Sequence, residues 1–207
     1  VNGGAHRGLF GALVALTGGV VTFLGASYTS SAENCGIVGV VGAEDVAPIL
    51  LEGLSILQSR GYDSAGIATI DPAGELKVTK YASRDSTADS IDLVKKNCSI
   101  HRNHHIGIAH TRWATHGGRT DANAHPHSDA KDRIALIHNG VINNSHELKK
   151  ELIAKGIKFR SETDTEVIAQ LIGVYLDEGM SLKAATSHAL SRCEGTWGIA
   201  VLSKSEP

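Results

Sequence analysis

CGIVGVVG, at residues 35–42, is the stretch of this sequence that decides the fold. Its continuous apolar, β-branched content predicts a buried strand, which begins with the thiol of Cys35. A buried structural cysteine is the plain interpretation. A catalytic cysteine needs a base, because the thiolate is the nucleophile, and no histidine lies beside Cys35 in the sequence. If Cys35 becomes the first residue, its own α-amine, with a pKa of about 8, can be that base.

The composition is that of an ordinary globular protein. The chain has 207 residues, of which 42% are hydrophobic and 20% charged, and its formal net charge is −2. These values exclude a disordered chain and give no reason to expect nucleic acid or an acidic membrane surface as a partner. The aromatic content of 4% also argues against a stacking platform for single-stranded nucleic acid.

The sequence ahead of Cys35 is a separate segment. Residues 9–26 are uncharged and rich in Gly and Ala, and Arg7 precedes them. A targeting or processing segment, a marginal membrane anchor and an unstructured extension are all open. We therefore expect an N-terminal extension at residues 1–34 and a globular domain at residues 35–207. We expect a cytoplasmic location, with organelle targeting or an anchor left open by the extension.

The globular part alternates between short strands and amphipathic helices. Besides the first strand, we expect strands at residues 67–70, 76–82, 106–110, 134–138 and 197–202. Helices are expected after Asp45, at residues 86–97, after Asn144 in a capping pattern with Glu147, after Thr163 or Asp164, and at residues 181–193. This order excludes all-α and all-β folds and favours sheets covered by helical layers.

Three later motifs place polar side chains where chemistry is possible. Arg112 follows a predicted strand, and a guanidinium there can clamp a carboxylate or form a surface ion pair. Asn139 and Gly140 end another predicted strand, where their amides can face an oxyanion or form a common turn. Asp164 either caps a helix or holds an ammonium group. For each motif taken alone, the structural interpretation (ion pair, turn or helix cap) is stronger than the functional one. Together with Cys35, they are the equipment for binding an amino acid at both ends and cleaving an amide with sulfur.

Histidines are concentrated between residues 101 and 138, and cysteines are few. A zinc site needs regularly spaced ligands such as His-x-x-x-His with a third partner, and the spacings here are irregular, so we expect no metal. Cys98 and Cys193 are expected to be structural thiols. Three widely spaced cysteines favour a reducing compartment over a disulfide framework.

Four longer strings, in this order, resemble the class II glutamine amidotransferases, and in detail their glutamine–fructose-6-phosphate aminotransferase branch. They are RGYDSAG at residues 60–66, HTRWATHG at residues 110–117, NAHPH at residues 123–127 and SETDTE at residues 161–166. The resemblance covers residues 35 to about 202. It implies an α+β fold, the αββα sandwich of N-terminal-nucleophile hydrolases, which we expect to lack its last strands here.

Carried over residue by residue, the resemblance implies a glutaminase site without a cofactor. Cys35 attacks the side-chain amide of glutamine, with its free α-amine as general base, and Asn139 and Gly140 form the oxyanion hole. Arg112 binds the α-carboxylate and Asp164 the α-ammonium group. The remaining site residues that it implies are Trp113 as a gate, Thr115 and His116 in the lining, and Arg60 and His125 in support.

The resemblance also implies partners. In the full enzymes the ammonia passes to a sugar-isomerase module that makes glucosamine 6-phosphate. We therefore expect glutamine as the substrate, fructose 6-phosphate only through that module, which this sequence lacks, and a homo-oligomer in the full enzyme. Because Asn34 precedes Cys35, the free amine requires cleavage after Asn34.

Two other functions stay open. One is a glutaminase like that of the amidophosphoribosyltransferases, against which RWATH at residues 112–116 argues. The other is a non-catalytic glutamine-binding fragment with a masked Cys35. Sequencing the N-terminus of the mature protein separates the second alternative from an active enzyme.

Overall fold

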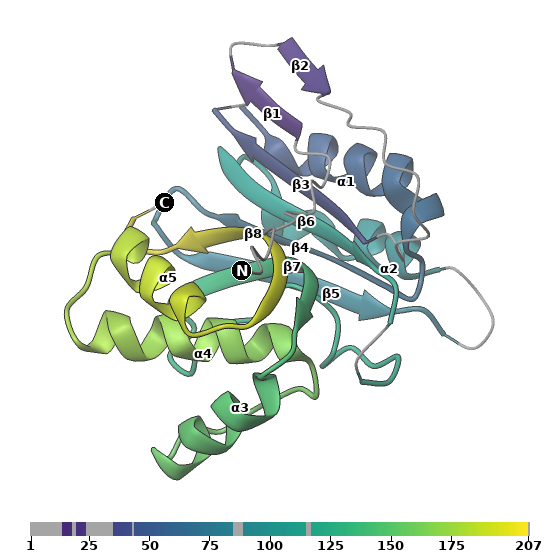
Figure 1. Ribbon diagram of the computed structural model, residues 1–207. Helices are drawn as coiled ribbons and strands as arrows, with labels where there is room; N and C mark the ends of the chain where they lie inside the picture. The colour runs from purple at the N-terminus through teal and green to yellow at the C-terminus, as the bar shows by residue number, and fades with distance from the viewer. Residues whose placement is uncertain are drawn as a thin grey trace, which may run out of the picture.

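The computed structural model describes residues 14–17, 20–23, 35–42, 44–84, 89–114 and 117–206, with side chains from residue 35 onward except that of Arg60. A short hairpin, β1 (Val14–Thr17) and β2 (Val20–Phe23), lies beside β3 (Gly36–Val41) (Figure 1). The rest of the expected targeting segment or anchor is outside the described residues. Within the described ranges, no helix has both the length and the apolar character needed to cross a membrane.

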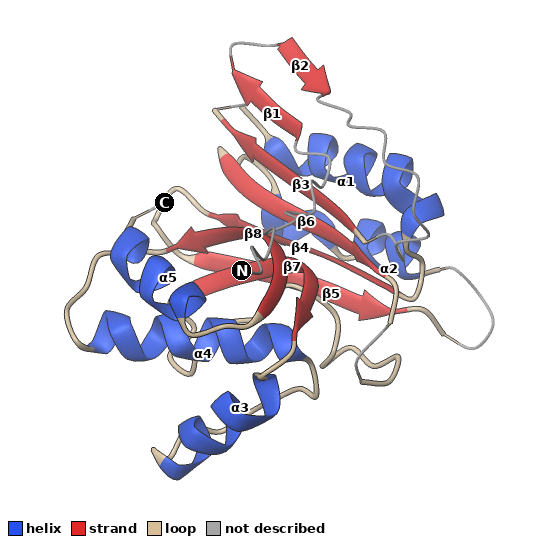
Figure 2. Cartoon of the chain, in the orientation of Figure 1, coloured by secondary structure: helices blue, strands red, loops and turns tan. Residues whose placement is uncertain are grey.

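The first sheet has four antiparallel strands. In spatial order they are β3, β6 (Ile106–Arg112), β4 (Ser64–Ile70) and β5 (Leu76–Ala82). Helices α1 (Val46–Leu57) and α2 (Ser90–Lys96) cover its outer face (Figure 2), and the 3₁₀ turns η1 (Gln58–Arg60) and η2 (Cys98–His101) follow them. Val38 and Val40 pack there against Leu50 and Leu54, and each fully buried Leu stabilises the fold by about 1.5–3 kcal/mol.

The second sheet pairs β7 (Ile134–Ile142) with β8 (Gly195–Ser203) in antiparallel register. Helices α4 (Asp164–Asp177) and α5 (Leu182–Ser191) cover its outer face, and α3 (Ser145–Ala154) projects beyond α4 (Figure 1). The two sheets face each other across an apolar layer that includes Ile37, Ile108 and Ile137. The order of layers is helix, sheet, sheet, helix, which confirms the αββα sandwich.

Side-chain alternation along single strands builds these layers. On β3, Ile37 points to the inter-sheet layer, whereas Val38 and Val40 point to α1. On β7, Ile137 faces the first sheet, whereas Leu136 faces α4. Because successive strand residues face opposite sides, a strand buried on both faces reads as the continuous apolar run seen at residues 35–42.

Three helices begin with a residue whose side chain caps them, and the cap that the sequence predicts at Asn144 is not formed. Asp45 caps α1 by accepting from the Ala47 N–H at 3.1 Å, and Ser181 caps α5. Thr163, not Asp164, caps α4, which leaves the Asp164 carboxylate free of capping. Asn144 stands at the N-cap position of α3, but its side chain does not cap the helix. Instead it forms hydrogen bonds with the segment between α5 and β8: it accepts from the Glu194 N–H and donates to the Arg192 carbonyl.

Element boundaries differ from the prediction most clearly at β7. The expected strand end at Asn139 and Gly140 is wrong, because both residues lie inside β7 and pair with Gly198 and Trp197 of β8. Likewise β6 continues to Arg112, and α2 starts at Ser90, later than expected. The turn interpretation of Asn-Gly fails because the partner strand arrives from 50 or more residues later in the chain.

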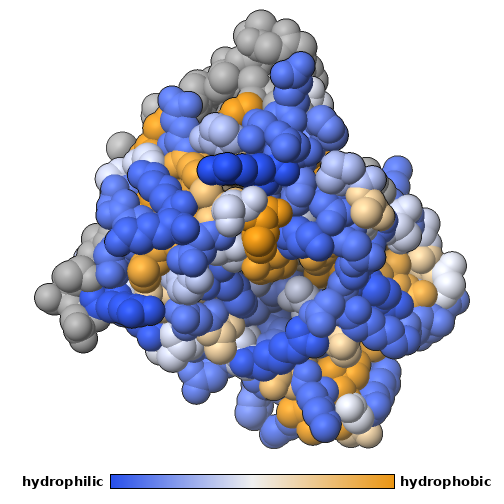
Figure 3. Space-filling model, turned by 180° about the vertical axis from the view of Figure 1, so that it is seen from behind, coloured by the Kyte–Doolittle hydropathy of each residue, from blue (hydrophilic) through white to orange (hydrophobic). Residues whose placement is uncertain are grey.

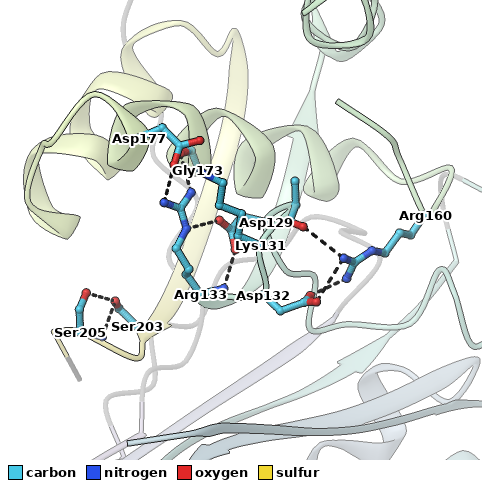
Figure 4. Close-up of polar contacts among 10 residues, drawn as sticks. Asp129, Lys131, Asp132, Arg133, Arg160, Gly173, Asp177, Ser203 and Ser205 are labelled. Carbon is cyan, nitrogen blue, oxygen red and sulfur yellow. Dashed lines mark hydrogen bonds and ion pairs between the residues drawn. The ribbon is translucent and has the colours of Figure 1, made fainter. Parts of the chain in front are cut away.

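An ion-pair network joins the start of β7 to α4 (Figure 4). The Arg133 guanidinium lies 2.7 Å from the buried Asp129 carboxylate and 2.6 Å from Asp177, and it donates to the Gly173 carbonyl at 2.8 Å. These contacts fix the entry of β7 against α4.

The face of the molecule seen from behind is mostly hydrophilic with separate apolar groups (Figure 3), as in ordinary globular domains.

Candidate active site

A small pocket lies where β3 begins, β6 ends, and α4 starts beside β7. It measures about 30 Å³. Its lining brings together most of the expected site residues with three that were not expected: Cys35, Arg112, Trp113, His125, His138, Gly140, Thr163, Asp164 and Thr165. A volume of this size holds about one water molecule, so a bound amino acid has to widen the pocket.

Strand pairing places the Cys35 thiol in this pocket. Gly36 of β3 pairs with Thr111 of β6, so the residues on either side, Cys35 and Arg112, come together. The Cys35 Sγ accepts from the Trp113 N–H at 3.3 Å, and the Gly36 N–H donates to the Thr111 hydroxyl at 3.1 Å. The thiol also donates to the Trp113 carbonyl at 3.8 Å, so both backbone groups of Trp113 hold the half-buried sulfur in place.

Asn139 and Gly140 reach the same place from the second sheet. The Asn139 Nδ2 donates to the carbonyl oxygen of Cys35 at 2.8 Å. Gly140 has φ 137°, and a Cβ there would lie 2.0 Å from the Thr196 carbonyl oxygen of β8. Only glycine fits at this position, so β7 carries a side-chain amide and a bare backbone position next to the thiol.

Arg112 and Asp164 supply opposite charges to the pocket, and both are more than nine-tenths buried. Burial lowers the pKa of Arg112, and the neighbouring charges of Cys35, Asp63 and Asp164 oppose that shift. The Asp164 Oδ2 accepts from the Ile142 N–H at 2.8 Å. A buried cation and a buried anion on one small pocket suit a zwitterionic ligand.

Two residues of the RGYDSAG string at residues 60–66, Asp63 and Gly61, contact the loop that follows Arg112. The Asp63 carboxylate accepts from the Ala114 N–H at 2.9 Å and forms an ion pair with Arg119, whose Nε lies 2.7 Å away, and thereby contacts the loop at both residues. A Cβ on Gly61 would lie 2.9 Å from the Arg112 carbonyl carbon. Sequence reasoning missed Asp63. The side chain of Arg60 lies outside the described residues, and so do Thr115 and His116 as a whole.

Lys80 and Gly66 hold the segment that carries His125. The Lys80 ammonium donates to three backbone carbonyls between residues 122 and 126, at 2.7–3.3 Å. Burial lowers the pKa of Lys80 to about 8. A Cβ on Gly66 would lie 2.1 Å from the His125 carbonyl oxygen. The second glycine of RGYDSAG is therefore required by the close approach of NAHPH.

Buried histidines form a hydrogen-bonded chain behind Asn139. His110 contacts Asn139 and His125, and Thr165 bridges His125 to His138, each at 2.8–2.9 Å. Burial lowers the pKa of His110 to about 3 and that of His125 well below its ordinary value. Among the described side chains, no group of three or more His, Cys, Asp or Glu residues is placed to hold a metal ion.

His110, His138 and Thr165 were not expected as site residues, although they stand inside or beside the strings that the sequence singled out. The two other cysteines have no place in the pocket. Cys193 is buried, and burial raises its pKa to about 11. The Cys98 thiol donates to a backbone carbonyl at 3.0 Å.

The chain is similar in sequence to a known domain family and to known proteins that carry this domain. Residues 95–207 match the family described as "Glutamine amidotransferase domain". The glutamine–fructose-6-phosphate aminotransferase (isomerizing) of Methanothermobacter thermautotrophicus is 48% identical over 84% of this chain and 28% of its own length. The protein of the same name from Gluconobacter oxydans is 45% identical over 82% of this chain and 27% of its own length. The chain thus spans little more than a quarter of these curated relatives.

Two solved structures share the fold. Glutamine phosphoribosylpyrophosphate amidotransferase from B. subtilis, complexed with ADP and GMP, superposes with a TM-score of 0.67 at 28% identity. A structure described as the allosteric regulatory enzyme of purine biosynthesis superposes with a TM-score of 0.68 at 30% identity. Each match covers 81% of this chain and 35% of the other.

Proposed function

Because this chain belongs to the glutamine amidotransferase domain family, we propose that it hydrolyses the side-chain amide of glutamine and releases ammonia. One observation carries the proposal. Cys35, Arg112 and Asp164 line one pocket although they are far apart in the sequence, and the Asn139 amide from β7 is hydrogen-bonded to the Cys35 backbone beside it. A nucleophile, an oxyanion donor and a clamp for both ends of an amino acid are the parts that such a reaction needs.

The proposed reaction begins at Cys35. Its α-amine takes the thiol proton, and Sγ attacks the amide carbon of glutamine to form a tetrahedral oxyanion. The oxyanion accepts from Gly140 N–H and from the second hydrogen of Asn139 Nδ2, the first being bonded to Cys35 O. The C–N bond then breaks, ammonia leaves with the proton from the amine, and a thioester remains. Water, deprotonated by the same amine, hydrolyses the thioester to glutamate and restores the thiol.

Substrate recognition in this proposal is ionic. The Arg112 guanidinium binds the α-carboxylate as a two-pronged donor, and the Asp164 carboxylate binds the α-ammonium group. Trp113 stands at the mouth, where its ring packs edge-on against Tyr62 with centroids 5.1 Å apart. Movement of Trp113 widens the small pocket. We assign glutamine binding also to Thr115 and His116, which follow Trp113 closely in the chain.

The domain division belongs to the same proposal. Residues 35–207 are the glutaminase domain and residues 1–34 an extension that is removed, because an α-amine locked in a peptide bond with Asn34 has no basic lone pair. The chain is 43–48% identical to the fructose-6-phosphate aminotransferases and only 28–30% identical to the purine-pathway structures. We therefore assign its ammonia to glucosamine 6-phosphate synthesis in a homo-oligomeric enzyme, with the isomerase module supplied by sequence beyond this chain.

Cys35 gives the decisive test. Cys35→Ala is expected to abolish glutamine hydrolysis and to abolish covalent labelling by a glutamine-shaped diazoketone, since both require the sulfur. Cys98→Ala, which removes a thiol outside the pocket, is the matched control and is expected to keep both. Labelling of Cys98 or Cys193 at a rate equal to that of Cys35 would refute the proposal.

Processing has its own test. A chain that begins at Cys35 is expected to turn over glutamine much faster than the chain with residues 1–34 attached, while both bind glutamate. The measurement is ammonia release under saturating glutamine, with mass spectrometry of the N-terminus. Equal turnover by the two forms would rule out the α-amine as the base without touching the role of the thiol.

A further inference from the structure

The orientation of the Asn139 amide is set by its two neighbours. Its Nδ2 lies 2.8 Å from the Cys35 carbonyl oxygen, which only accepts, so the NH₂ group must face Cys35. Its Oδ1 therefore faces His110 Nε2, also at 2.8 Å. An amide oxygen only accepts, so His110 must carry its ring proton on Nε2.

This constraint passes along the buried chain of side chains. His125 Nδ1 lies 2.9 Å from His110 Nδ1 and 3.3 Å from His110 Nε2. Since His110 uses Nε2 as donor, its bare Nδ1 is the nitrogen that accepts from His125 Nδ1–H. His125 Nε2 is then bare and accepts the Thr165 hydroxyl proton at 2.9 Å. Thr165 has no second proton to donate. His138 Nδ1 lies 2.9 Å from the Thr165 oxygen while His138 Nε2 lies 3.4 Å from the Thr196 carbonyl oxygen, so the two neighbours of this ring favour opposite tautomers. The donors of His110, His125 and Thr165 point toward Asn139.

Burial keeps these rings at one proton each. His110, His125, Thr165 and His138 are all less than 5% exposed, and the cost of a buried charge lowers the pKa values of the three histidines. A singly protonated imidazole has one donor and one acceptor. From Thr165 to Asn139 the chain therefore has a single direction, since reversal of the His110 or His125 ring would set two acceptors face to face.

We propose that His110 is a positioning residue that locks the Asn139 amide with its NH₂ group toward the nucleophile, and that His125 and Thr165 hold His110 in the required tautomer. This inference rests on the proposed role of Asn139 as an oxyanion donor. Without the His110 N–H, the Asn139 amide is free to turn its oxygen toward the developing negative charge. Repulsion then replaces donation.

Ring ¹⁵N chemical shifts of the histidines test the arrangement without any activity. At pH 7, His110 is expected to show the Nε2–H tautomer and His125 the Nδ1–H tautomer. Assignment follows from loss of each signal in the matching His→Phe variant. An Nδ1–H tautomer or a doubly protonated ring at His110 overturns the inference. If the tautomers are as expected but Cys35→Ala still hydrolyses glutamine, the proposed function fails while the locked amide stands.

A double-mutant cycle tests the consequence. Asn139→Ala alone is expected to lower kcat by about 10²–10³. His110→Phe is expected to lower kcat by at least about tenfold with little change in KM, and His110→Gln, whose amide N–H replaces Nε2–H, to restore most of it. Because His110 acts through Asn139, the double variant should match Asn139→Ala within about twofold. Additive losses overturn the inference.

His101→Phe is the matched control. His101 is fully buried and bonds the hydroxyls of Thr69 and Thr79 at 2.7–2.8 Å, and it does not line the pocket. Its loss should lower the unfolding midpoint and leave kcat unchanged. An equal fall of kcat in His101→Phe would mean that any buried histidine has this effect, which also overturns the inference. If His110→Phe does not fold, the ¹⁵N measurement on the unmodified chain remains decisive.

Discussion

At the scale of the residue, Arg112 illustrates how burial suits a charged side chain to the recognition role that we propose for it. A buried guanidinium has lost most of its water, which is costly unless anions replace it. The structure brings the charges of Cys35, Asp63 and Asp164 near it. A substrate carboxylate entering the pocket adds an anion where the cation is poorly hydrated, so the attraction is stronger than at the surface.

Charge removal at either end of the pocket is therefore expected to weaken glutamine use. Losing one partner of a buried charge pair costs about 2–5 kcal/mol, so Arg112→Ala should lower kcat/KM at least about tenfold, and Arg112→Lys should rescue poorly because an ammonium lacks the planar fork. Asp164→Asn should act similarly while still accepting from Ile142 N–H. Alkylation of Cys35 by iodoacetamide should persist in each variant. Normal glutamine kinetics in Arg112→Ala would show that the pocket is wrongly assigned.

At the scale of the element, β7 joins structure to chemistry. One face of the strand fills the core against α4 and the other faces the first sheet, and the same alternation sends Asn139 toward Cys35 and His138 toward α4. Gly140 sits where β8 passes closest. The strand places its catalytic groups only if its register with β8 is kept.

Gly140→Ala is expected to break that register. The new Cβ would lie 2.0 Å from the Thr196 carbonyl oxygen, at a φ of 137° that L side chains rarely adopt, so a loss of at least about 1–3 kcal/mol in the free energy of unfolding should follow. Gly39→Ala on β3 is the matched control, because nothing lies within 4 Å of its Cβ. It should change stability by no more than about 1 kcal/mol. Urea denaturation measures both, and equal stability would contradict the described pairing.

At the scale of the whole molecule, the four layers enclose an unusual number of neutral histidines. His101, His110, His125 and His127 are each less than 5% exposed, and burial is the main cause of the lowered pKa in all four. In the unfolded chain these groups take up a proton near pH ~6.5. The folded state binds fewer protons than the unfolded state between that pH and the folded pKa.

Acid destabilisation should consequently begin unusually early. Stability is full above pH ~6.5 and falls as the pH drops toward the folded pKa values, about 4 for His101 and about 3 for His110, with each histidine contributing up to about 1.4 kcal/mol per pH unit. Urea midpoints between pH 7 and 5, above the range where most carboxylates titrate, measure this slope. His101→Phe should reduce the slope by about one proton. A flat profile down to pH 5 would show that these histidines are charged or exposed.

Local signals account for much of what the sequence could predict. The apolar run after Cys35, the capping residues Asp45 and Ser181, and the strings around Arg112 and Asp164 act over a few residues, and the structure keeps them. The prediction failed at Asn139, where a turn pair proved to lie within a strand, and at Asn144, whose side chain bonds a distant segment. Both failures have one cause, a partner that lies about 50 residues away in the chain.

By itself, the sequence determined the layer-forming pattern of strands and helices and predicted Cys35, Arg112 and Asp164 as site residues, because periodicity and short motifs are local properties. Tertiary structure alone decided that Cys35 meets Asn139, that Gly140 has no room for a side chain, and that His110, His125 and Thr165 form a hydrogen-bonded chain behind Asn139. These facts depend on which strands pair and in what register. Pairing is set by burial across the two sheets, which no short stretch of sequence contains.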